Sequence, residues 1–310
     1  MLLKEVHITG FWGKYRLDWE LNDTVNILSG INGAGKTTLL DVIYSLTTSP
    51  EINMDILRKV KEVRLVFTEG YSIEYSRPSD TTPSPFISYK QNGQAITRQQ
   101  YLVNVKTTAI STFDGTMPSL EDYQKYILLR SDKIRSELDW DVERSLDLYY
   151  RYVNGISQEV EKAIRENNLT DLSKYYRKKN KFLELMNEMF QSTRKTIFES
   201  RNGIEFKLED GTLIPARDLS SGEKQLLILM IGTLTEKEEE FITFWDEPEI
   251  SLHIDWQRML IRVIRTLNSH SQLIISTHSP SIIYEGWEKM VVNMEDLATY
   301  TTPASADNCG

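Results

Sequence analysis

The sequence has 310 residues, of which 40% are hydrophobic and 26% are charged, as in globular proteins with one large domain or two modest ones. Its formal net charge of -9 excludes a surface coated for nucleic acid, although a local basic patch is compatible with it. Charge at Lys4 comes too early for a signal peptide, and no run approaches the roughly 20 apolar residues that cross a bilayer. The single cysteine, Cys309, excludes a disulfide framework, so we expect a cytoplasmic protein without membrane contact.

An N-terminal run of strands leads into a glycine-rich loop. Apolar and polar residues alternate over residues 6–27, which predicts antiparallel strands. The apolar residues just before the loop predict a buried strand, and those after it recur at helical spacing. This strand–loop–helix context is the one that the phosphate-binding pattern G-x-x-x-x-G-K-[ST] requires. The residues assigned to the loop are Gly30, Asn32, Gly33, Ala34, Gly35, Lys36, Thr37 and Thr38.

The loop predicts a site for the phosphates of ATP. Its glycines let backbone N–H groups turn toward phosphate oxygens, and the following helix adds the positive end of its dipole. We expect Lys36 to reach the β- and γ-phosphates and the Thr37 hydroxyl to bind Mg²⁺. ATP and Mg²⁺ are therefore the expected cofactors.

Two hairpins are predicted beyond the helix of the loop. Residues 63–67 and 71–75 flank a Glu-Gly turn, and an Asn-Gly turn divides residues 89–96. We expect these strands to form an antiparallel side sheet.

A charged helical segment separates the two halves of the chain. Residues 119–197 contain no proline and a single glycine, Gly155, and their apolar positions recur at a spacing of three to four. Because no heptad pattern is sustained, we predict a compact helical arm rather than a long rod. Residues 174–181 combine cations with aromatic rings, which suits a nucleic-acid backbone, but such a run is more often a solvated helix face.

The second half begins with a helix cap. Ser220 or Ser221 can cap the helix that follows Gly222, with Glu223 in its first turn. The residue types alone do not distinguish an ordinary cap from a ligand-binding one.

Two apolar strands follow, and each ends in a polar group. Residues 241–246 end at Asp246, which would lie beside the phosphate loop in a doubly wound sheet and is the expected Mg²⁺ partner. Glu247 is placed to polarise an attacking water as general base. The strand over residues 273–276 leads to His278, although a lone histidine is more often structural than functional.

In their order and spacing, these motifs resemble the ABC-type ATPases, in the Ser-Ser-Gly-Glu form of the SMC- and RecF-like group. The resemblance implies an α/β head with a doubly wound mixed sheet, an antiparallel side sheet and a helical insertion. It also implies a head-to-head homodimer around two ATP molecules, with His278 as the switch histidine that senses the γ-phosphate. The residues implied to act across the dimer are the signature Ser220, Ser221, Gly222 and Glu223 and the D-loop Ser251, Leu252 and His253.

The resemblance also implies a division of the chain into two lobes and an arm, and a place where the adenine of ATP would bind. Residues 1–118 would form the first lobe, 119–197 the arm, 198–296 the second lobe, and 297–310 a polar, disordered tail after a last strand near residues 290–294. The aromatic and basic residues Phe11, Trp12, Lys14 and Tyr15 are candidates to frame the adenine or ribose. The candidate Q-loop glutamines, none in a persuasive context, are Gln91, Gln94, Gln99 and Gln100.

The motif around the second strand narrows the group. Residues 246–253, together with 277–280, are similar to the OLD and Septu ATPases of bacterial anti-phage defence. OLD proteins carry a Toprim nuclease behind the ATPase, and this sequence has no room for one. The defence interpretation therefore implies a separate effector, such as the HNH nuclease of Septu-like systems and some retrons. A RecF- or SMC-like DNA-repair ATPase is the alternative, and a transporter subunit is disfavoured by the large insertion.

Overall fold

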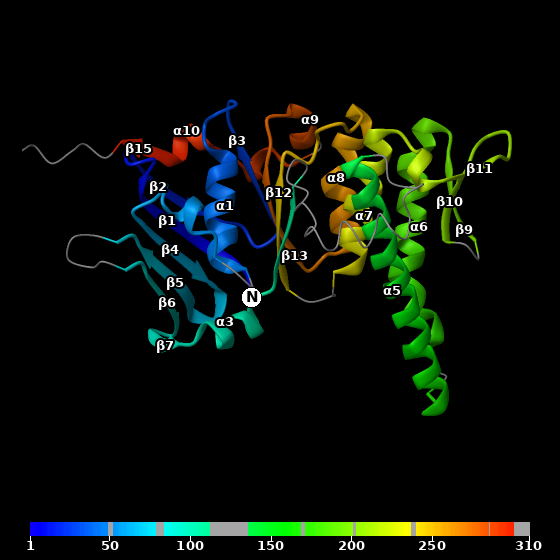
Figure 1. Cartoon of the computed structure of the whole chain (residues 1–310), viewed down its shortest axis with the longest axis horizontal. Helices are drawn as coiled ribbons and strands as arrows, with labels where there is room; N and C mark the ends of the chain where they lie inside the picture. The colour runs from blue at the N-terminus through cyan, green and yellow to red at the C-terminus, as the bar shows by residue number, and fades with distance from the viewer. Residues whose placement is uncertain are drawn as a thin grey trace, which may run out of the picture. The chain divides into compact units, whose positions relative to one another are not determined.

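The computed structural model describes residues 1–48, 52–78, 84–111, 136–168, 171–200, 203–236, 240–284 and 286–300 (Figure 1). The chain divides into two compact units, and each is built from several stretches of sequence. Unit 1 comprises Met1–Ser111, Glu239–Pro248 and His270–Gly310, whereas unit 2 comprises Thr112–Glu238 and Glu249–Ser269. The predicted tail from residue 301 and the start of the predicted arm up to residue 135 lie outside the described residues.

Unit 1 contains a five-stranded parallel sheet in the order β14-β3-β13-β12-β8. Its central strand β13 is buried along its whole length, as expected for a strand covered on both faces. The polar residues that end β3, β12 and β13 therefore share the carboxyl edge of one sheet. The strands are β3 (Val25–Ser29), β8 (Thr107–Ser111), β12 (Phe241–Asp246), β13 (Ser271–Ser276) and β14 (Val291–Asn293).

The second sheet of unit 1 has seven strands in the order β15-β2-β1-β4-β5-β6-β7, and its pairs are antiparallel. Both predicted hairpins are confirmed, as β4–β5 and β6–β7. The antiparallel prediction for residues 6–27 holds for β1 and β2 but not at its end, where β3 joins the parallel sheet. The strands are β1 (Leu3–Phe11), β2 (Tyr15–Glu20), β4 (Glu62–Phe67), β5 (Tyr71–Ser76), β6 (Phe86–Gln91), β7 (Gln94–Ile96) and β15 (Ala298–Tyr300).

Helix α1 (Lys36–Thr47) lies between the two sheets in Figure 1. Its apolar residues belong to one continuous core with residues from β1, β4, β5, β12 and β13. This packing fixes the start of α1, and with it the glycine-rich loop, against both sheets. The remaining short elements of unit 1 are α2 (Met54–Leu57), η1 (Thr68–Gly70), α3 (Arg98–Asn104), α9 (Pro280–Ile283), η5 (Glu288–Met290) and α10 (Met294–Leu297).

Strand β15 corrects the predicted disordered tail, because residues 298–300 pair with β2. Their backbone groups satisfy the outer edge of β2, and Tyr300 packs edge-on against Tyr15 with ring centroids 5.0 Å apart. The strand predicted near residues 290–294 is therefore followed by another strand. Residues 298–300 form an edge strand, and this explains their polar character.

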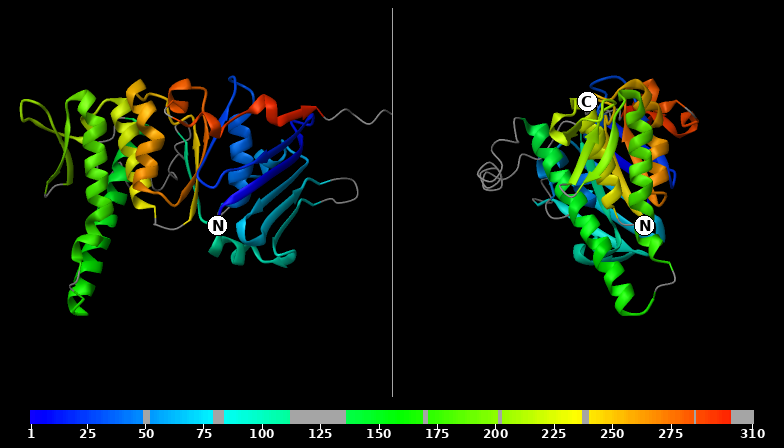
Figure 2. Two further views of the ribbon diagram at one scale, coloured as in Figure 1. Left: turned by 180° about the vertical axis from the view of Figure 1, so that it is seen from behind. Right: turned by 90° about the vertical axis from the view of Figure 1, so that its right-hand side faces the viewer.

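Unit 2 is mainly helical, with α5 (Glu137–Arg165), α6 (Arg177–Phe190), α7 (Ser221–Thr235) and α8 (Ile254–Leu267). Helix α5 packs on α7, and its C-terminal end projects beyond α7 and α8 in Figures 1 and 2. The turn η2 (Leu172–Tyr176) contacts both α5 and α6. A three-stranded antiparallel sheet in the order β11-β10-β9 packs on α6. Its strands and the remaining turns are η3 (Gln191–Thr193), β9 (Thr196–Ser200), β10 (Gly203–Lys207), β11 (Leu213–Pro215) and η4 (Ala216–Asp218).

The two compact units divide the chain differently from the predicted lobes and arm, whose boundaries at 118, 197 and 296 stay predictions. Strands β12 and β13 lie in unit 1 rather than in a second lobe, because both pair in the parallel sheet that contains β3. Conversely, the helix α8 between them belongs to unit 2 and packs on α6 and α7. No helix in the described ranges is both long and apolar enough to cross a membrane.

Candidate nucleotide site

The glycine-rich loop connects β3 to α1 at the carboxyl edge of the parallel sheet. Gly35, the residue before α1, has φ +98°, and a Cβ there would lie 2.9 Å from the Trp12 ring and 3.0 Å from the Phe11 ring. Glycine is therefore required at this position both for its backbone conformation and for space. The side chain of Lys36 is 4% exposed, and its Nζ donates hydrogen bonds to the carbonyl oxygens of Gly30, at 3.0 Å, and Ile31, at 3.2 Å.

A pair of oxygen ligands suitable for a hard cation lies beside the loop. The Thr37 hydroxyl donates a hydrogen bond of 2.8 Å to Asp246 Oδ2, which joins the start of α1 to the end of β12. Mg²⁺ is usually held by one or two carboxylates together with substrate phosphates and waters, so it needs no larger cage. Among the described residues no group of three or more acidic, histidine or cysteine side chains forms such a cage. The pair Thr37 and Asp246 therefore fits Mg²⁺ bound together with a nucleotide.

Ser276, at the end of β13, is a member of the site that sequence reasoning missed. Its side chain is fully buried, and its hydroxyl donates a hydrogen bond to Asp246 Oδ1. Asp246 thus accepts one hydroxyl on each carboxylate oxygen, which fixes its orientation. The contact forms because Asp246 and Ser276 are paired in the register of β12 and β13. The local sequence does not reveal this strand pairing.

Glu247 lies between Lys36 and His278. Its Oε1 is 4.0 Å from Lys36 Nζ and 3.4 Å from His278 Nδ1. The backbone of Glu247 has φ +46°, an uncommon conformation for a residue with a side chain, and its N–H donates to the Ser276 carbonyl oxygen. Such strain is typical of functional positions, where the surrounding structure holds one side chain in one direction. The sequence-predicted residues Lys36, Glu247 and His278 therefore converge.

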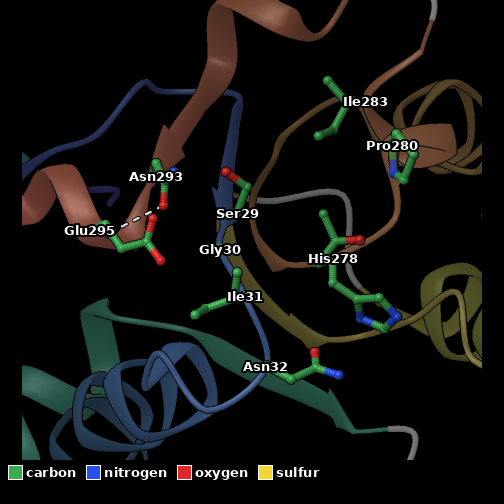
Figure 3. A pocket seen from close by; sticks show the side chains of 10 residues that line it. Ser29, Gly30, Ile31, Asn32, His278, Pro280, Ile283, Asn293 and Glu295 are labelled. Carbon is green, nitrogen blue, oxygen red and sulfur yellow. Dashed lines mark hydrogen bonds between the residues drawn. The ribbon is translucent and has the colours of Figure 1, made fainter.

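A cavity of about 510 Å³ opens beside this cluster (Figure 3). The loop residues 29–32 run through the middle of the view, and His278 approaches from the turn after β13. Polar groups from β14 and α10 lie on one side of the loop, and the apolar side chains of α9 lie on the other. The wall residues are Thr277, Pro280, Ile283, Asn293 and Glu295.

Two of the four candidates for a base contact lie against the loop. Phe11 and Trp12 stack with ring centroids 5.0 Å apart, and both rings approach Gly35. Trp12 is 42% exposed and has φ +50°, so its ring is available to a ligand and its backbone is strained. Tyr15 instead packs against Tyr300, away from the loop.

The predicted signature is the N-terminus of α7 in unit 2. Ser220, not Ser221, is the cap, because its hydroxyl accepts the Glu223 N–H while the Glu223 carboxylate accepts the Ser220 N–H at 2.9 Å. Both serines are exposed, whereas Gly222 and Glu223 are buried. The exposed hydroxyls and the free end of the helix could bind an anion from outside the unit.

The predicted D-loop packs directly against the signature. A Cβ at Gly222 would collide with the backbone carbonyl oxygen of Ser251, which itself has φ +67°. Leu252 is buried beneath the turn, and His253 is the N-cap of α8. Signature and D-loop thus form one surface in unit 2.

The basic run over residues 174–181 is largely engaged within unit 2. Lys178 Nζ donates to the Glu236 carbonyl oxygen at 2.5 Å, and Lys179 Nζ lies 2.7 Å from Glu199 Oε2. Lys174 lies over the ring of Tyr175. These contacts favour a structural role for much of the run over a continuous nucleic-acid surface.

The comparisons with known proteins agree with this geometry. A family model described as "AAA domain, putative AbiEii toxin, Type IV TA system" matches residues 25–283. Septu protein PtuA of Bacillus thuringiensis is 23% identical over 308 residues, which cover 91% of this chain and 73% of that protein. DNA replication and repair protein RecF of Clostridium botulinum is 25% identical over 251 residues, which cover 74% of this chain and 66% of RecF.

Solved structures with the same fold are heads of SMC proteins. An SMC head bound to the C-winged helix domain of ScpA superposes with a TM-score of 0.59 at 15% identity, over 97% of this chain and 98% of that one. The SMC head domain from Thermotoga maritima gives a TM-score of 0.54 over the same shares. The predicted ATPase-head fold is therefore confirmed.

Proposed function

The chain belongs to this AAA-domain family of P-loop ATPases, in the SMC- and RecF-like ABC-type group, and from that premise we propose that it binds and hydrolyses ATP as a dimer. The observation that carries the proposal is the convergence of Lys36, Thr37, Asp246, Glu247 and His278 at one edge of one sheet.

Each residue of the cluster has a distinct role in the proposed reaction. The N–H groups of the loop and Lys36 Nζ bind the phosphates, and Lys36 exchanges its carbonyl partners for phosphate oxygens. Thr37 and Asp246 would hold Mg²⁺, which when bound would supply positive charge against the phosphates. Glu247 orients the attacking water and accepts its proton, and His278 contacts the γ-phosphate next to Glu247.

A second copy of the chain supplies the rest of the site. Ser220, Ser221 and Gly222 would contact the γ-phosphate bound by the other copy, and the D-loop would cross the interface beside them. The exposure of both serines at the positive end of α7 supports this role. Because neither copy completes the site, γ-phosphate binding favours the closed dimer, and hydrolysis releases it.

The similarity to Septu protein PtuA, which extends over 91% of the chain, supports a role in anti-phage defence. In this role the dimer senses an infection signal and gates a separate effector, such as an HNH nuclease. Co-expression with the adjacent genes and purification through a tag on the ATPase test this role. We expect a stable complex with a nuclease whose activity changes in the Glu247→Gln variant. Recovery of the ATPase alone would count against gating.

The ATPase itself is tested by turnover and by mass in solution. Lys36→Ala should abolish nucleotide binding, because no other described side chain of the loop carries a positive charge. Glu247→Gln should bind ATP, lose about 100-fold or more in turnover and accumulate as a dimer in light scattering. Normal turnover in Glu247→Gln would place the general base elsewhere.

The RecF match supports a second candidate, a DNA-repair ATPase. Stimulation of turnover by gapped or single-stranded DNA, without any partner protein, would favour it over effector gating.

A further inference from the structure

We propose that the end of α6 and the turn that follows it, residues 189–195, position both the signature and the D-loop. The two positioning residues are Lys195 in this segment and Trp256 in α8. This "α6 turn" lies wholly within unit 2. The inference rests on the proposed function, because it concerns the two loops that one copy would present to the ATP of another.

Lys195 connects the α6 turn to the signature. Its Nζ lies 2.6 Å from Glu223 Oε1, and the side chains are 19% and 2% exposed. Glu223 uses its other oxygen to hold the Ser220 N–H and hydroxyl, at 2.9 Å and 3.0 Å. The carboxylate is therefore fixed at both ends, so a displacement of Lys195 changes the position of the cap.

Trp256 connects the same turn to the D-loop. Its Nε1 donates to the Met189 carbonyl oxygen at 2.7 Å and approaches Ser192 Oγ at 3.1 Å. The ring is 3% exposed and packs against Phe190, with centroids 5.9 Å apart. Trp256 lies in the first turn of α8, directly after the D-loop, so this anchor fixes where α8 begins.

The geometry of the α6 turn explains how one short segment reaches both loops. Arg194 has φ +56°, and the Lys195 N–H donates to the Phe190 carbonyl oxygen at 3.3 Å. This left-handed reversal ends α6 and directs Lys195 toward α7, while the end of α6 stays under Trp256.

The signature and the D-loop are also in direct contact with each other. A Cβ at Gly222 would collide with the Ser251 carbonyl oxygen and lie 3.7 Å from the Trp256 ring. Since signature and D-loop touch, a shift of either anchor moves both. Core packing alone would not need a buried charge pair at this place, because an apolar pair fills such a space without the cost of desolvating ions.

Helix α8 also offers a matched control. Arg262 lies 2.6 Å from Glu188, so this ion pair joins the same two helices, but both side chains are more than 40% exposed. Arg262→Ala breaks the contact between α8 and α6 without touching the α6 turn.

The experiment compares Lys195→Met, Trp256→Phe, Lys195→Arg and Arg262→Ala with the wild type in three measurements. These are the Kd of a fluorescent ATP analogue under dilute conditions, ATP-dependent dimerisation with turnover, and amide hydrogen exchange over residues 219–226 and 250–257. Trp256→Phe keeps an aromatic ring, although a smaller one, but removes the N–H donor, so it tests the hydrogen bond with a smaller loss of volume than alanine would cause.

We expect Lys195→Met and Trp256→Phe to bind the analogue within about 2-fold of the wild type but to lose about 10-fold or more in turnover. Each should speed exchange in both segments, although Lys195 forms its ion pair with the signature and Trp256 belongs to the helix that follows the D-loop. Lys195→Arg should restore much of the activity, and Arg262→Ala should behave as the wild type.

Two results would overturn the inference: wild-type turnover and dimerisation in both variants, or faster exchange confined to the segment that each anchor touches. If the wild type neither dimerises nor hydrolyses ATP, the proposed function fails, but the exchange data still decide the coupling. A loss of analogue binding together with unfolding would show that the α6 turn serves stability alone.

Discussion

The hydroxyl of Ser276 offers a sharp test of how the Mg²⁺ site is built. Ser276→Ala removes one of the two hydroxyls that Asp246 accepts, and leaves Thr37 on the other carboxylate oxygen. A hydrogen bond to a charged group contributes about 1.5–3 kcal/mol. Asp246 is only partly buried, so water replaces some of this loss, and we expect the free energy of unfolding to fall by about 1 kcal/mol.

The larger effect should be on the metal. Residues that orient a metal ligand typically change metal affinity about 10- to 100-fold when removed. We therefore expect the Mg²⁺ concentration at half-maximal turnover to rise about 10-fold in Ser276→Ala, with a smaller change in the limiting rate at saturating Mg²⁺. Titration of turnover with Mg²⁺ at fixed ATP measures both quantities.

Ser271→Ala is the matched control, because Ser271 is 1% exposed and lies at the opposite end of the same strand. It should cost stability without changing the Mg²⁺ dependence. Equal Mg²⁺ dependence in the wild type and Ser276→Ala would refute the role assigned to the hydroxyl. A rise of the same size in Ser271→Ala would show that β13 transmits a general loss of packing.

Three further predictions concern the adenine contact of Trp12, the helix cap that Glu223 forms with Ser220, and the basic residues 174–181. Trp12→Ala should weaken ATP binding about 5-fold, because stacking of the adenine on the ring contributes about 1 kcal/mol. The binding of inorganic triphosphate, which has no adenine, should stay unchanged. Equal weakening of both ligands would show that Trp12 does not contact the adenine. Burial raises the pKa of the Glu223 carboxyl, but hydrogen bonds from Lys195 and Ser220 outweigh it, so this pKa lies below its ordinary value of 4.5. The ionised Glu223 carboxylate therefore contributes its full stabilisation of the folded state above pH 4.5. This contribution is lost as the pH falls through the lower pKa of the folded state. Thermal melts of wild type and Glu223→Gln should differ at pH 7, and the difference should shrink as the pH falls through the folded-state pKa of Glu223; a constant difference would contradict the assignment. Single-stranded DNA should show no steep salt-dependent binding through residues 174–181, and a log–log salt slope that falls in Arg177→Ala would overturn this expectation.

The parts of the site that the sequence predicts are those built from neighbouring residues. The P-loop, the Ser220 cap and the acids after β12 each lie within a few residues of the strand or helix that positions them, so spacing alone places them. The contact between Ser276 and Asp246 crosses 30 residues and depends on register between two strands. No local pattern encodes that register, because β13 is buried on both faces and its residues do not alternate between core and solvent.

Tertiary pairing also explains the elements that were missed. Residues 298–300 resemble a polar tail by composition, and only the open edge of β2 makes them a strand. The sheet β9–β11 was not predicted, because its strands are short and only four of their thirteen residues are buried. Its burial depends on α6, as Phe206 stacks on Phe190 with centroids 5.0 Å apart.

The left-handed backbone of Glu247 implies that folding and catalysis make opposite demands at one position. A glycine there relieves strain of order 1 kcal/mol but removes the carboxylate, whereas a β-branched residue adds strain. In a complete substitution series at residue 247, glycine and asparagine should rank above glutamate in thermal stability, and glutamate alone should rank first in turnover. The most active protein in that series would then not be the most stable one.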